Sequence, residues 1–489
     1  MEHFDVLIVG AGLSGIGAAH HLQKAHPDKS YALFEARDAI GGTWDLFRYP
    51  GVRSDSDMQT LGYRFRPWTE AKAIADGPAI RSYVRATASD AGIEAKIRFN
   101  HTIERAAWSS ADARYTVSAR RTDTGEAVEV TCGFLFVCSG YYRYDEGFTP
   151  RFEGTERFGG QIIHPQHWPE DLDYAGKRVV VIGSGATAIT LVPALADKAA
   201  HVTMLQRSPS YVLSIPAEDP IANGLRRILG DRRAYAVTRW KNVAVTSLIY
   251  QLSRRRPALV RKLIRKAQMG QLPDGYAVDT HFKPRYQPWD ERLCIVPDGD
   301  LFRVIRHGRA SIVTDRIATF TEAGLQLESG AELEADIVIT ATGLNLVAFG
   351  GIALEVDGRE VVLSEAMAYK GLMLSDVPNF AFVVGYTNAS WTLKADLVSE
   401  YVCRLLTHMD ERGFAQAVPV NDDPSITTRP LLDFAAGYVQ RSLDAFPKQG
   451  SKAPWQLGMN YAQDVVTLRH GKLDDGTMRF TGARALAVR

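Results

Sequence analysis

The chain has 489 residues, of which 46% are hydrophobic and 23% are charged, and its formal net charge is +1. At roughly 150 residues per domain, this length predicts several structural units of ordinary globular composition. The composition excludes long disordered tracts, and the balanced charge gives no reason to expect a nucleic-acid partner.

The four cysteines are scattered, and no two of them form a C-x-x-C pair. A zinc ribbon, a dithiol redox centre and a flavin disulfide reductase are therefore disfavoured, and no metal site is expected. So few cysteines in a long chain fit a reducing cytoplasm, which is the expected location.

The N-terminal run Phe4–Gly10 is apolar but short, and Asp5 interrupts it. It predicts a buried strand, because no basic segment precedes it and no small-residue cleavage site follows. No stretch approaches the ~18 uninterrupted apolar residues that a transmembrane helix needs.

The first unit begins with the expected strand Val6–Val9, the glycine turn Gly10-x-Gly12-x-x-Gly15, a helix from Ile16 to about residue 24 and a second strand that ends at Glu35. This order is typical of a dinucleotide-binding βαβ unit. The glycines allow a tight turn and a close approach of the backbone to a pyrophosphate, while Glu35 can accept hydrogen bonds from ribose hydroxyls.

A second unit of the same form begins at the expected strand Arg178–Ile182. Its turn is Gly183-x-Gly185-x-x-Ala188, with Thr187 inside it, and the next strand is His201–Gln206. Arg207 and Ser208 then stand where the first unit has Glu35. An arginine there can pair with a 2′-phosphate, which favours NADPH over NADH.

Two such openings predict an α/β protein with two doubly wound, Rossmann-like domains. Between them, residues 103–138 alternate apolar and polar side chains as hairpin strands do. The apolar runs Phe134–Gly140 and Asp336–Gly343 end in small residues and are expected to be late strands of the two domains.

Residues 216–290 are expected to form a basic helical insert. Its segment Arg254–Lys266 places Leu259, Val260, Leu263 and Ile264 on one helical face. We favour an amphipathic helix that covers a domain and exposes a solvated basic face. The alternatives are a surface that contacts a membrane peripherally or one that attracts NADPH.

The segment between the two units has the pattern F-x-G-x-x-x-H-x-x-x-W-P, formed by Phe158, Gly160, His164, Trp168 and Pro169. It resembles the fingerprint of Baeyer–Villiger monooxygenases at every fixed position, and we call Phe158–Trp168 the fingerprint segment. The related N- and S-oxygenating flavin monooxygenases share its first part but usually lack the final Trp-Pro.

The resemblance extends over essentially the whole chain and is strongest to the ethionamide-activating branch of that family. The segments that carry it are Trp44–Asp55, His164–Pro169, Trp289–Cys294 and Gly385–Trp391. It implies FAD in the first site, wrapped by Gly42, Thr43 and Trp44, although the spacing alone would permit NAD. It implies NADPH in the second site and a linking, non-catalytic role for the fingerprint segment.

The resemblance also implies the reaction, in which one oxygen atom of O2 is inserted beside a ketone carbonyl through a flavin C4a-peroxide, giving an ester or lactone. Arg292 matches the active-site arginine and Asp55 matches the carboxylate that pairs with it, with Asp57 in reserve. Sulfides or thiocarbonyls are further expected substrates. The alternative is an N- or S-oxygenating flavin monooxygenase.

Two positions depart from the pattern of many family members. Ser54 replaces a cysteine before the active-site aspartate, and Glu291 replaces a lysine that helps to hold the 2′-phosphate of NADPH. Arg207 must then carry more of the preference for NADPH. The sequence leaves the particular ketone or sulfide and the oligomeric state open.

The expected domain division follows from the positions of these motifs. It assigns 1–150 to the FAD-binding domain, 151–215 to the linker and the first part of the NADPH-binding domain, 216–290 to the helical insert, 291–365 to the second part of the NADPH-binding domain, and 366–489 to the second part of the FAD-binding domain with the C-terminal segment.

Overall fold

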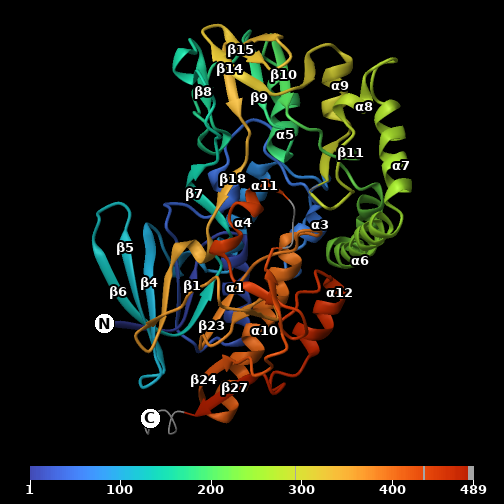
Figure 1. Ribbon diagram of the computed structural model, residues 1–489. Helices are drawn as coiled ribbons and strands as arrows, with labels where there is room; N and C mark the ends of the chain where they lie inside the picture. Colours follow the sequence, from blue (N-terminus) through green and yellow to red (C-terminus); the bar gives the residue numbers. More distant parts are fainter. Residues whose placement is uncertain (292, 433–435, 483–489) are drawn as a thin grey trace.

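The computed structural model describes residues 1–291, 293–432 and 436–482. Two sheets with parallel cores organise the molecule, one at each end of the view in Figure 1. The expected α/β class with two Rossmann-like units is confirmed by these sheets and their helices.

The first sheet has nine strands in the order β20-β19-β4-β5-β6-β1-β2-β3, with β23 paired to β6. Its strands are β1 (Glu2–Val9), β2 (Tyr31–Phe34), β3 (Ile97–Arg98), β4 (His101–Ser109), β5 (Arg114–Arg121), β6 (Ala127–Val137), β19 (Ala353–Val356), β20 (Arg359–Glu360) and β23 (Phe380–Phe382). The β4–β5–β6 meander is antiparallel, as the alternating pattern of residues 103–138 predicts.

Helices pack on the parallel part of this sheet. The main ones are α1 (Leu13–Ala25), α4 (Gly77–Asp90) and α10 (Trp391–Arg412), and α1 lies against α10. Strand β1 is central and pairs with β2 and β6, which explains the continuous apolar run Val6–Val9 in its second half.

The second sheet has the order β13-β10-β9-β17-β8, and all its pairings are parallel. Its strands are β8 (Gln161–Ile163), β9 (Arg178–Ile182), β10 (His201–Gln206), β13 (Ala310–Thr314) and β17 (Ile337–Thr340), with helices α5 (Ala186–Leu195) and α9 (Asp300–Arg306). The antiparallel strands β14 (Ile317–Thr321), β15 (Gly324–Leu327) and β16 (Glu332–Glu334) form a separate three-stranded sheet.

Two chain segments connect the sheets, and they pair with each other. Strand β7 (Tyr142–Gly147) leaves the first sheet, β18 (Leu344–Leu346) returns to it, and the two are antiparallel. The chain then enters β19, which pairs with β4. The expected division placed 291–365 with the NADPH part, whereas β19 and β20 lie in the first sheet. We therefore propose that the return crossing ends before Ala353.

Helices α6 (Pro220–Arg255) and α7 (Pro257–Met269) dominate the insert and form the right-hand edge of the molecule in Figure 1. The single helix expected over Arg254–Lys266 is wrong, because α6 ends at Arg255 and Pro257 begins α7. The expected apolar face is also only half covered. Val260 and Ile264 are buried, but Leu259 and Leu263 are 47% and 53% exposed.

The remaining elements are short or lie near the C-terminus. They are α2 (Thr43–Leu46), α3 (Met58–Leu61), α8 (Val278–His281), α11 (Gly437–Gln440), α12 (Tyr461–Asp464), β11 (Val212–Ile215), β12 (Cys294–Pro297), β21 (Ala368–Tyr369), β22 (Met373–Leu374), β24 (Phe414–Pro419), β25 (Thr428–Pro430), β26 (Lys448–Gly450), β27 (Met478–Gly482), and the single turns at Glu94–Lys96, Thr155–Arg157, Pro165–His167, Ala348–Gly351, Leu443–Ala445 and Val465–His470. Across the described ranges, no helix has the length and apolar character needed to cross a membrane.

A buried ion cluster anchors α6 to the first domain. The carboxylate of Asp396, on α10, accepts hydrogen bonds from His21 Nε2 at 3.2 Å, Arg239 Nη2 at 3.3 Å and the backbone N–H of Arg64 at 3.2 Å. Arg239 also donates to the carbonyl oxygens of Gln59 and Gly62, at 2.8 and 2.7 Å. One buried cation thus joins the insert, α10 and the segment around α3.

Replacing Asp396 with alanine tests this anchor. The change leaves the Arg239 guanidinium buried without its counter-charge, which typically costs about 3–5 kcal/mol. We expect the free energy of unfolding, measured by urea denaturation followed by fluorescence, to fall by that amount. The matched control is Asp410→Ala, which removes the half-exposed ion pair with Lys29 and should cost about 0–1 kcal/mol. Equal losses in the two variants would contradict the anchoring role.

Candidate functional site

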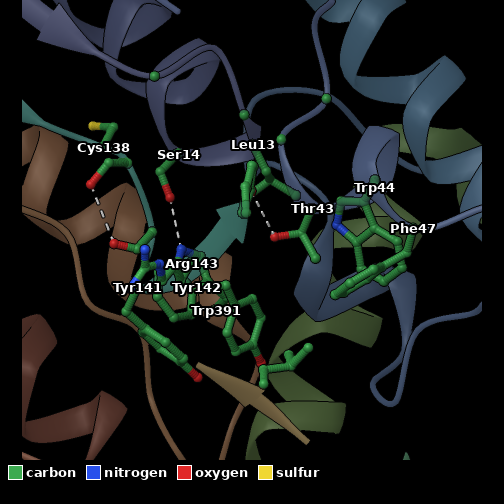
Figure 2. Close-up of a pocket in the computed structure, with 18 of the residues that line it drawn as sticks. Leu13, Ser14, Thr43, Trp44, Phe47, Cys138, Tyr141, Tyr142, Arg143 and Trp391 are labelled. Atoms are coloured by element: carbon green, nitrogen blue, oxygen red, sulfur yellow. Dashed lines mark hydrogen bonds between the residues drawn. The ribbon is translucent and has the colours of Figure 1, made fainter. Parts of the chain in front are cut away.

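A cavity of about 710 Å³ lies between the two sheets and is lined from both sides. The first domain contributes the turn Gly10–Ser14, Glu35 and the segment Gly41–Trp44. The second contributes residues of the first turns of α5, among them Ala186, Thr187 and Thr190. Figure 2 shows Ser14, Trp44 and Trp391 among the side chains at its wall.

The first glycine turn brings backbone closer together than a side chain would allow. A Cβ atom on Gly15 would lie 1.8 Å from the carbonyl oxygen of Gly10, and one on Gly10 would lie 3.0 Å from that of Cys138. Gly10 also has a φ of +96°, which favours glycine. These residues therefore fix the sharp turn between β1 and α1.

Gly12 and Gly42 face each other across the cavity's edge. A Cβ on Gly12 would lie 3.4 Å from the Cα of Gly42, and Gly42 itself has a φ of +56°. Gly12 precedes the first turn of α1 and carries no side chain that could cap it. The first N–H groups of α1 are thus left for an anionic group, as a bound pyrophosphate requires.

Glu35 is buried at the end of β2, and its two oxygens accept hydrogen bonds from the backbone N–H groups of Ala11, at 2.7 Å, and Arg37, at 3.0 Å. Burial raises the pKa of Glu35 above its ordinary value, although these hydrogen bonds oppose the shift. Glu35, whose carboxylate the sequence predicts to bind a ribose, therefore also stabilises the glycine turn. Glu35 lines the cavity next to this turn.

The second glycine turn repeats these constraints between β9 and α5. A Cβ on Gly183 would lie 2.3 Å from the carbonyl oxygen of Ala341, and the φ of Gly183 is +135°. Gly185 is exposed, and a Cβ there would meet no described heavy atom within 4 Å beyond its neighbours. Ala188 is buried under the helix. Room for a ligand therefore lies at the N-terminus of α5.

Arg207 and Ser208 are exposed directly after β10. The hydroxyl of Ser184, inside the glycine turn, donates to the carbonyl oxygen of Ser208 at 3.0 Å, so turn and loop lie together. Partial burial raises the pKa of Glu291, while the charge of Arg207 opposes that shift. Glu291, which replaces a lysine of many family members, therefore interacts electrostatically with Arg207. Arg207 is the residue that we expect to bind the 2′-phosphate of NADPH.

The segment that carries Asp55 crosses from the first domain to the second. Tyr49 makes a hydrogen bond with Thr187 of α5, and burial raises its pKa to about 12, so its hydroxyl stays protonated. Arg53 pairs with Asp300 of α9. A Cβ on Gly51 would lie 2.7 Å from the Cβ of Ala194. These contacts hold the segment against the second domain.

Asp55 lines the cavity, whereas Asp57, the reserve candidate, does not. The carboxylate of Asp57 caps α3 by accepting from the backbone N–H of Thr60 at 3.0 Å, and it also accepts from Asn242 Nδ2 at 2.8 Å. The structure therefore favours Asp55. Its expected partner Arg292 lies outside the described residues. Ser54 is buried and donates its hydroxyl proton to the carbonyl oxygen of Ser56 at 2.6 Å.

The fingerprint segment lies along the connection between the sheets. Phe158 packs on Phe320, with ring centroids 5.9 Å apart, and a Cβ on Gly160 would lie 2.3 Å from the carbonyl oxygen of Asp336. Trp168 is half-buried against the core of the second domain. These three residues pack within the second domain and do not line the large cavity.

His164 joins the two connecting segments. Its Nε2 lies 3.1 Å from the carbonyl oxygen of Gly343, and its Nδ1 accepts from the backbone N–H of Gln166 at 3.2 Å, which fixes Nε2 as the donor. A Cβ on Gly147 would overlap the imidazole ring. Burial lowers the pKa of His164, which keeps the ring neutral. His164 thus lies between Gly147 and Gly343, at the paired connections between the two sheets.

Sequence reasoning did not single out several residues that line the cavity. They are Ser14, Cys138, Tyr141, Tyr142 and Trp391. Trp391 Nε1 donates to Ser14 Oγ at 2.7 Å, drawn in Figure 2, although the two residues are 377 positions apart. Only the segment Gly385–Trp391, already quoted for its resemblance, carried a signal for this contact.

Comparisons with known proteins agree with this architecture. Residues 75–376 match the flavin-binding monooxygenase-like family, and residues 8–75 match the NAD(P)-binding Rossmann-like domain. The FAD-containing monooxygenase EthA of Mycobacterium tuberculosis is 58% identical over 480 residues, covering 98% of each chain.

Two solved structures share the fold. An oxidized steroid monooxygenase bound to NADP has a TM-score of 0.76 at 22% identity, covering 98% of this chain and all of the other. A cyclohexanone monooxygenase from Rhodococcus sp. Phi1 bound to NADP+ has a TM-score of 0.74 at 19% identity, covering 98% and 99%. The chain therefore belongs to the flavin-binding monooxygenase-like family, and its predicted class, an FAD-containing monooxygenase with a two-dinucleotide fold, is confirmed.

Proposed function

We propose that the chain is an NADPH-using Baeyer–Villiger monooxygenase that converts ketones into esters or lactones and also oxidises sulfides or thiocarbonyls. The observation that carries this proposal is the single cavity lined by both glycine-turn helices, α1 and α5. A nicotinamide and a flavin can exchange a hydride only if their rings meet, and this arrangement brings the two binding turns to one space.

Gly10, Gly12, Gly15, Glu35, Gly42, Thr43 and Trp44 are proposed to hold FAD. The pyrophosphate fits at the uncapped N-terminus of α1, where Gly12 and Gly42 leave no side chain in its way. Glu35 is positioned at the end of β2 to accept from ribose hydroxyls. When bound, FAD supplies the redox centre that accepts a hydride from NADPH and reacts with O2.

Gly183, Gly185, Thr187, Ala188, Arg207 and Ser208 are proposed to hold NADPH. The open space at Gly185 suits the nicotinamide dinucleotide's pyrophosphate, and Arg207 is exposed where a 2′-phosphate would lie. Glu291 opposes that contact by repulsion. Preference for NADPH over NADH therefore depends on the balance between one arginine and one carboxylate.

Asp55 and Arg292 are proposed as the catalytic pair. A fixed guanidinium stabilises the negative charge that forms on the substrate's carbonyl oxygen, and an adjacent carboxylate orients that guanidinium. The contacts of Tyr49, Gly51 and Arg53 with α5 and α9 keep Asp55 in the cavity wall. The cysteines are few and scattered in a long chain, which suits a reducing compartment, and we propose a cytoplasmic location for the reaction.

Isotope-labelled oxygen tests the reaction itself. The purified protein with FAD, NADPH, labelled O2 and a panel of linear, cyclic and aryl ketones should yield esters that carry one labelled atom, detected by mass spectrometry. Parallel incubations with sulfides should give labelled sulfoxides. Label that enters only sulfoxides or amine oxides would instead indicate an N- or S-oxygenating enzyme.

Asp55→Asn tests the proposed catalytic carboxylate. Loss of its charge should lower kcat for ketone oxidation about 100-fold, which corresponds to about 3 kcal/mol of transition-state stabilisation. The matched control is Asp57→Asn, since the amide oxygen can still cap α3. Steady-state kinetics should show kcat for Asp57→Asn near that of the unmodified chain. Equal losses in both variants would assign the effect to local folding.

Arg207 and Glu291 are expected to act in opposite directions on NADPH. Arg207→Ala removes a charge-assisted contact of about 1.5–3 kcal/mol, so KM for NADPH should rise about 10- to 100-fold. Glu291→Gln removes a repulsion and should lower that KM. Neither change should alter KM for NADH, which lacks the 2′-phosphate. Parallel shifts for both nucleotides would assign Arg207 a role in shaping the loop instead.

A further inference from the structure

Exposed apolar side chains are concentrated on α6 and α7. Sixteen large apolar side chains are exposed among the described residues, and twelve of them lie within 221–269. They are Ile221, Ile228, Leu229, Val237, Trp240, Val245, Leu248, Ile249, Leu252, Leu259, Leu263 and Met269. A solvated basic face does not account for them, because single exposed apolar residues are ordinary but a contiguous cluster marks an interaction surface.

The same two helices are strongly basic. Residues 220–269 contain thirteen lysines and arginines and one acidic residue, Asp231, although the whole chain has a net charge of only +1. Of the cations that point outward, Arg254 pairs with Asp290 and Arg265 with Asp279. Arg255, Arg256, Arg261, Lys262 and Lys266 are also exposed, around the break between the helices.

The opposite side of these helices is fixed to the molecule. Ala234, Tyr235, Thr238, Arg239 and Val243 of α6 are buried, as are Val260 and Ile264 of α7. Arg239 ends in the ion cluster with Asp396. The apolar and basic outer side therefore belongs to two helices that are fixed to the molecule, and we call the exposed side chains of residues 221–269 the basic-apolar face.

Charge decides which partner suits this face. A second copy of the chain meeting the same face would bring two strongly cationic helix pairs together, which costs free energy. A polyanion such as nucleic acid would satisfy the cations but leave the apolar side chains in water. NADPH attraction likewise gives no role to leucine, isoleucine and tryptophan. An anionic bilayer satisfies both groups, since apolar side chains enter the acyl boundary while lysine and arginine contact headgroups.

We propose that the basic-apolar face docks the protein peripherally on an anionic lipid bilayer. The helices lie along the membrane plane, with Trp240, Leu248, Leu259 and Leu263 among the inserting side chains. This inference is independent of the reaction proposed above, because it concerns the outer side of the insert alone.

Docking places the active-site segment close to the lipid. On its inner side, α6 binds the residues that follow Asp55, through Arg239 to Gln59 and Gly62 and through Asn242 to Asp57. Trp240 also lies against Tyr461, with ring centroids 5.7 Å apart. The inner side of α6 and the segment that follows Asp55 therefore pack as one unit, and the basic-apolar face lies on the outer side of that unit.

Vesicle co-sedimentation tests the proposal with the full-length, FAD-loaded protein. The probes are phosphatidylcholine vesicles with and without phosphatidylserine, and bound protein is measured in the pellet. We expect binding to the anionic vesicles only, and a loss of binding as NaCl is raised, because screening weakens attraction to headgroups.

Two sets of variants separate the contributions of charge and insertion. A charge variant, Arg255→Gln with Arg256→Gln, Arg261→Gln and Lys262→Gln, should weaken binding about a hundredfold or more, since each of the four cations near an anionic surface contributes a factor of about five. An insertion variant, Leu248→Ser with Leu259→Ser and Leu263→Ser, should weaken it similarly. The matched control, Val362→Ser with Val466→Ser, changes exposed apolar residues elsewhere and should bind normally.

Several outcomes would overturn the proposal. Equal binding to neutral and anionic vesicles would mean nonspecific apolar adhesion. Absence of vesicle binding, together with a concentration-dependent dimer in analytical ultracentrifugation that the insertion variant abolishes, would identify a second copy as the partner. NADPH oxidation in detergent-free buffer serves as the folding control for all variants, since none of the substituted residues lines the cavity.

Discussion

This structure depends on three close approaches at glycines, where the backbone lies too near another group to leave room for any side chain. Gly15 touches the carbonyl of Gly10, Gly183 touches that of Ala341, and Gly147 lies under the ring of His164. The first two contacts open the N-termini of α1 and α5 toward one cavity. The third clamps the connections between the sheets. A methyl group at any of the three would displace a dinucleotide turn or a linker.

This constraint explains which parts of the fold the sequence predicts well. A glycine turn between a buried strand and a helix is a local pattern, so both βαβ openings and the positions of Glu35 and Arg207 follow from neighbouring residues alone. The return of β19 to the first sheet cannot be predicted from neighbouring residues. A four-residue strand has too few positions to show periodicity, and its pairing with β4 is set by tertiary contacts.

The same distinction applies to the site and the insert. Helical periodicity groups Leu259 with Val260 and Leu263 with Ile264, but only packing decides that the second member of each pair is buried. Spacing does not distinguish Asp55 from Asp57; the cap that Asp57 provides to α3 and its bond with Asn242 favour Asp55 as the proposed catalytic carboxylate. The Trp391–Ser14 contact joins distant segments, so periodicity does not predict it, and only the family resemblance of Gly385–Trp391 draws attention to that segment.

The ion cluster around Asp396 connects the insert with the first domain and with the segment that follows Asp55. It holds α6 through Arg239, α1 through His21 and the segment after Asp55 through the backbone of Arg64. A buried charge with fixed partners permits little sliding, because any displacement leaves an ion without its partner at a cost of several kcal/mol. The cluster therefore fixes the position of α6 relative to the segment that follows Asp55.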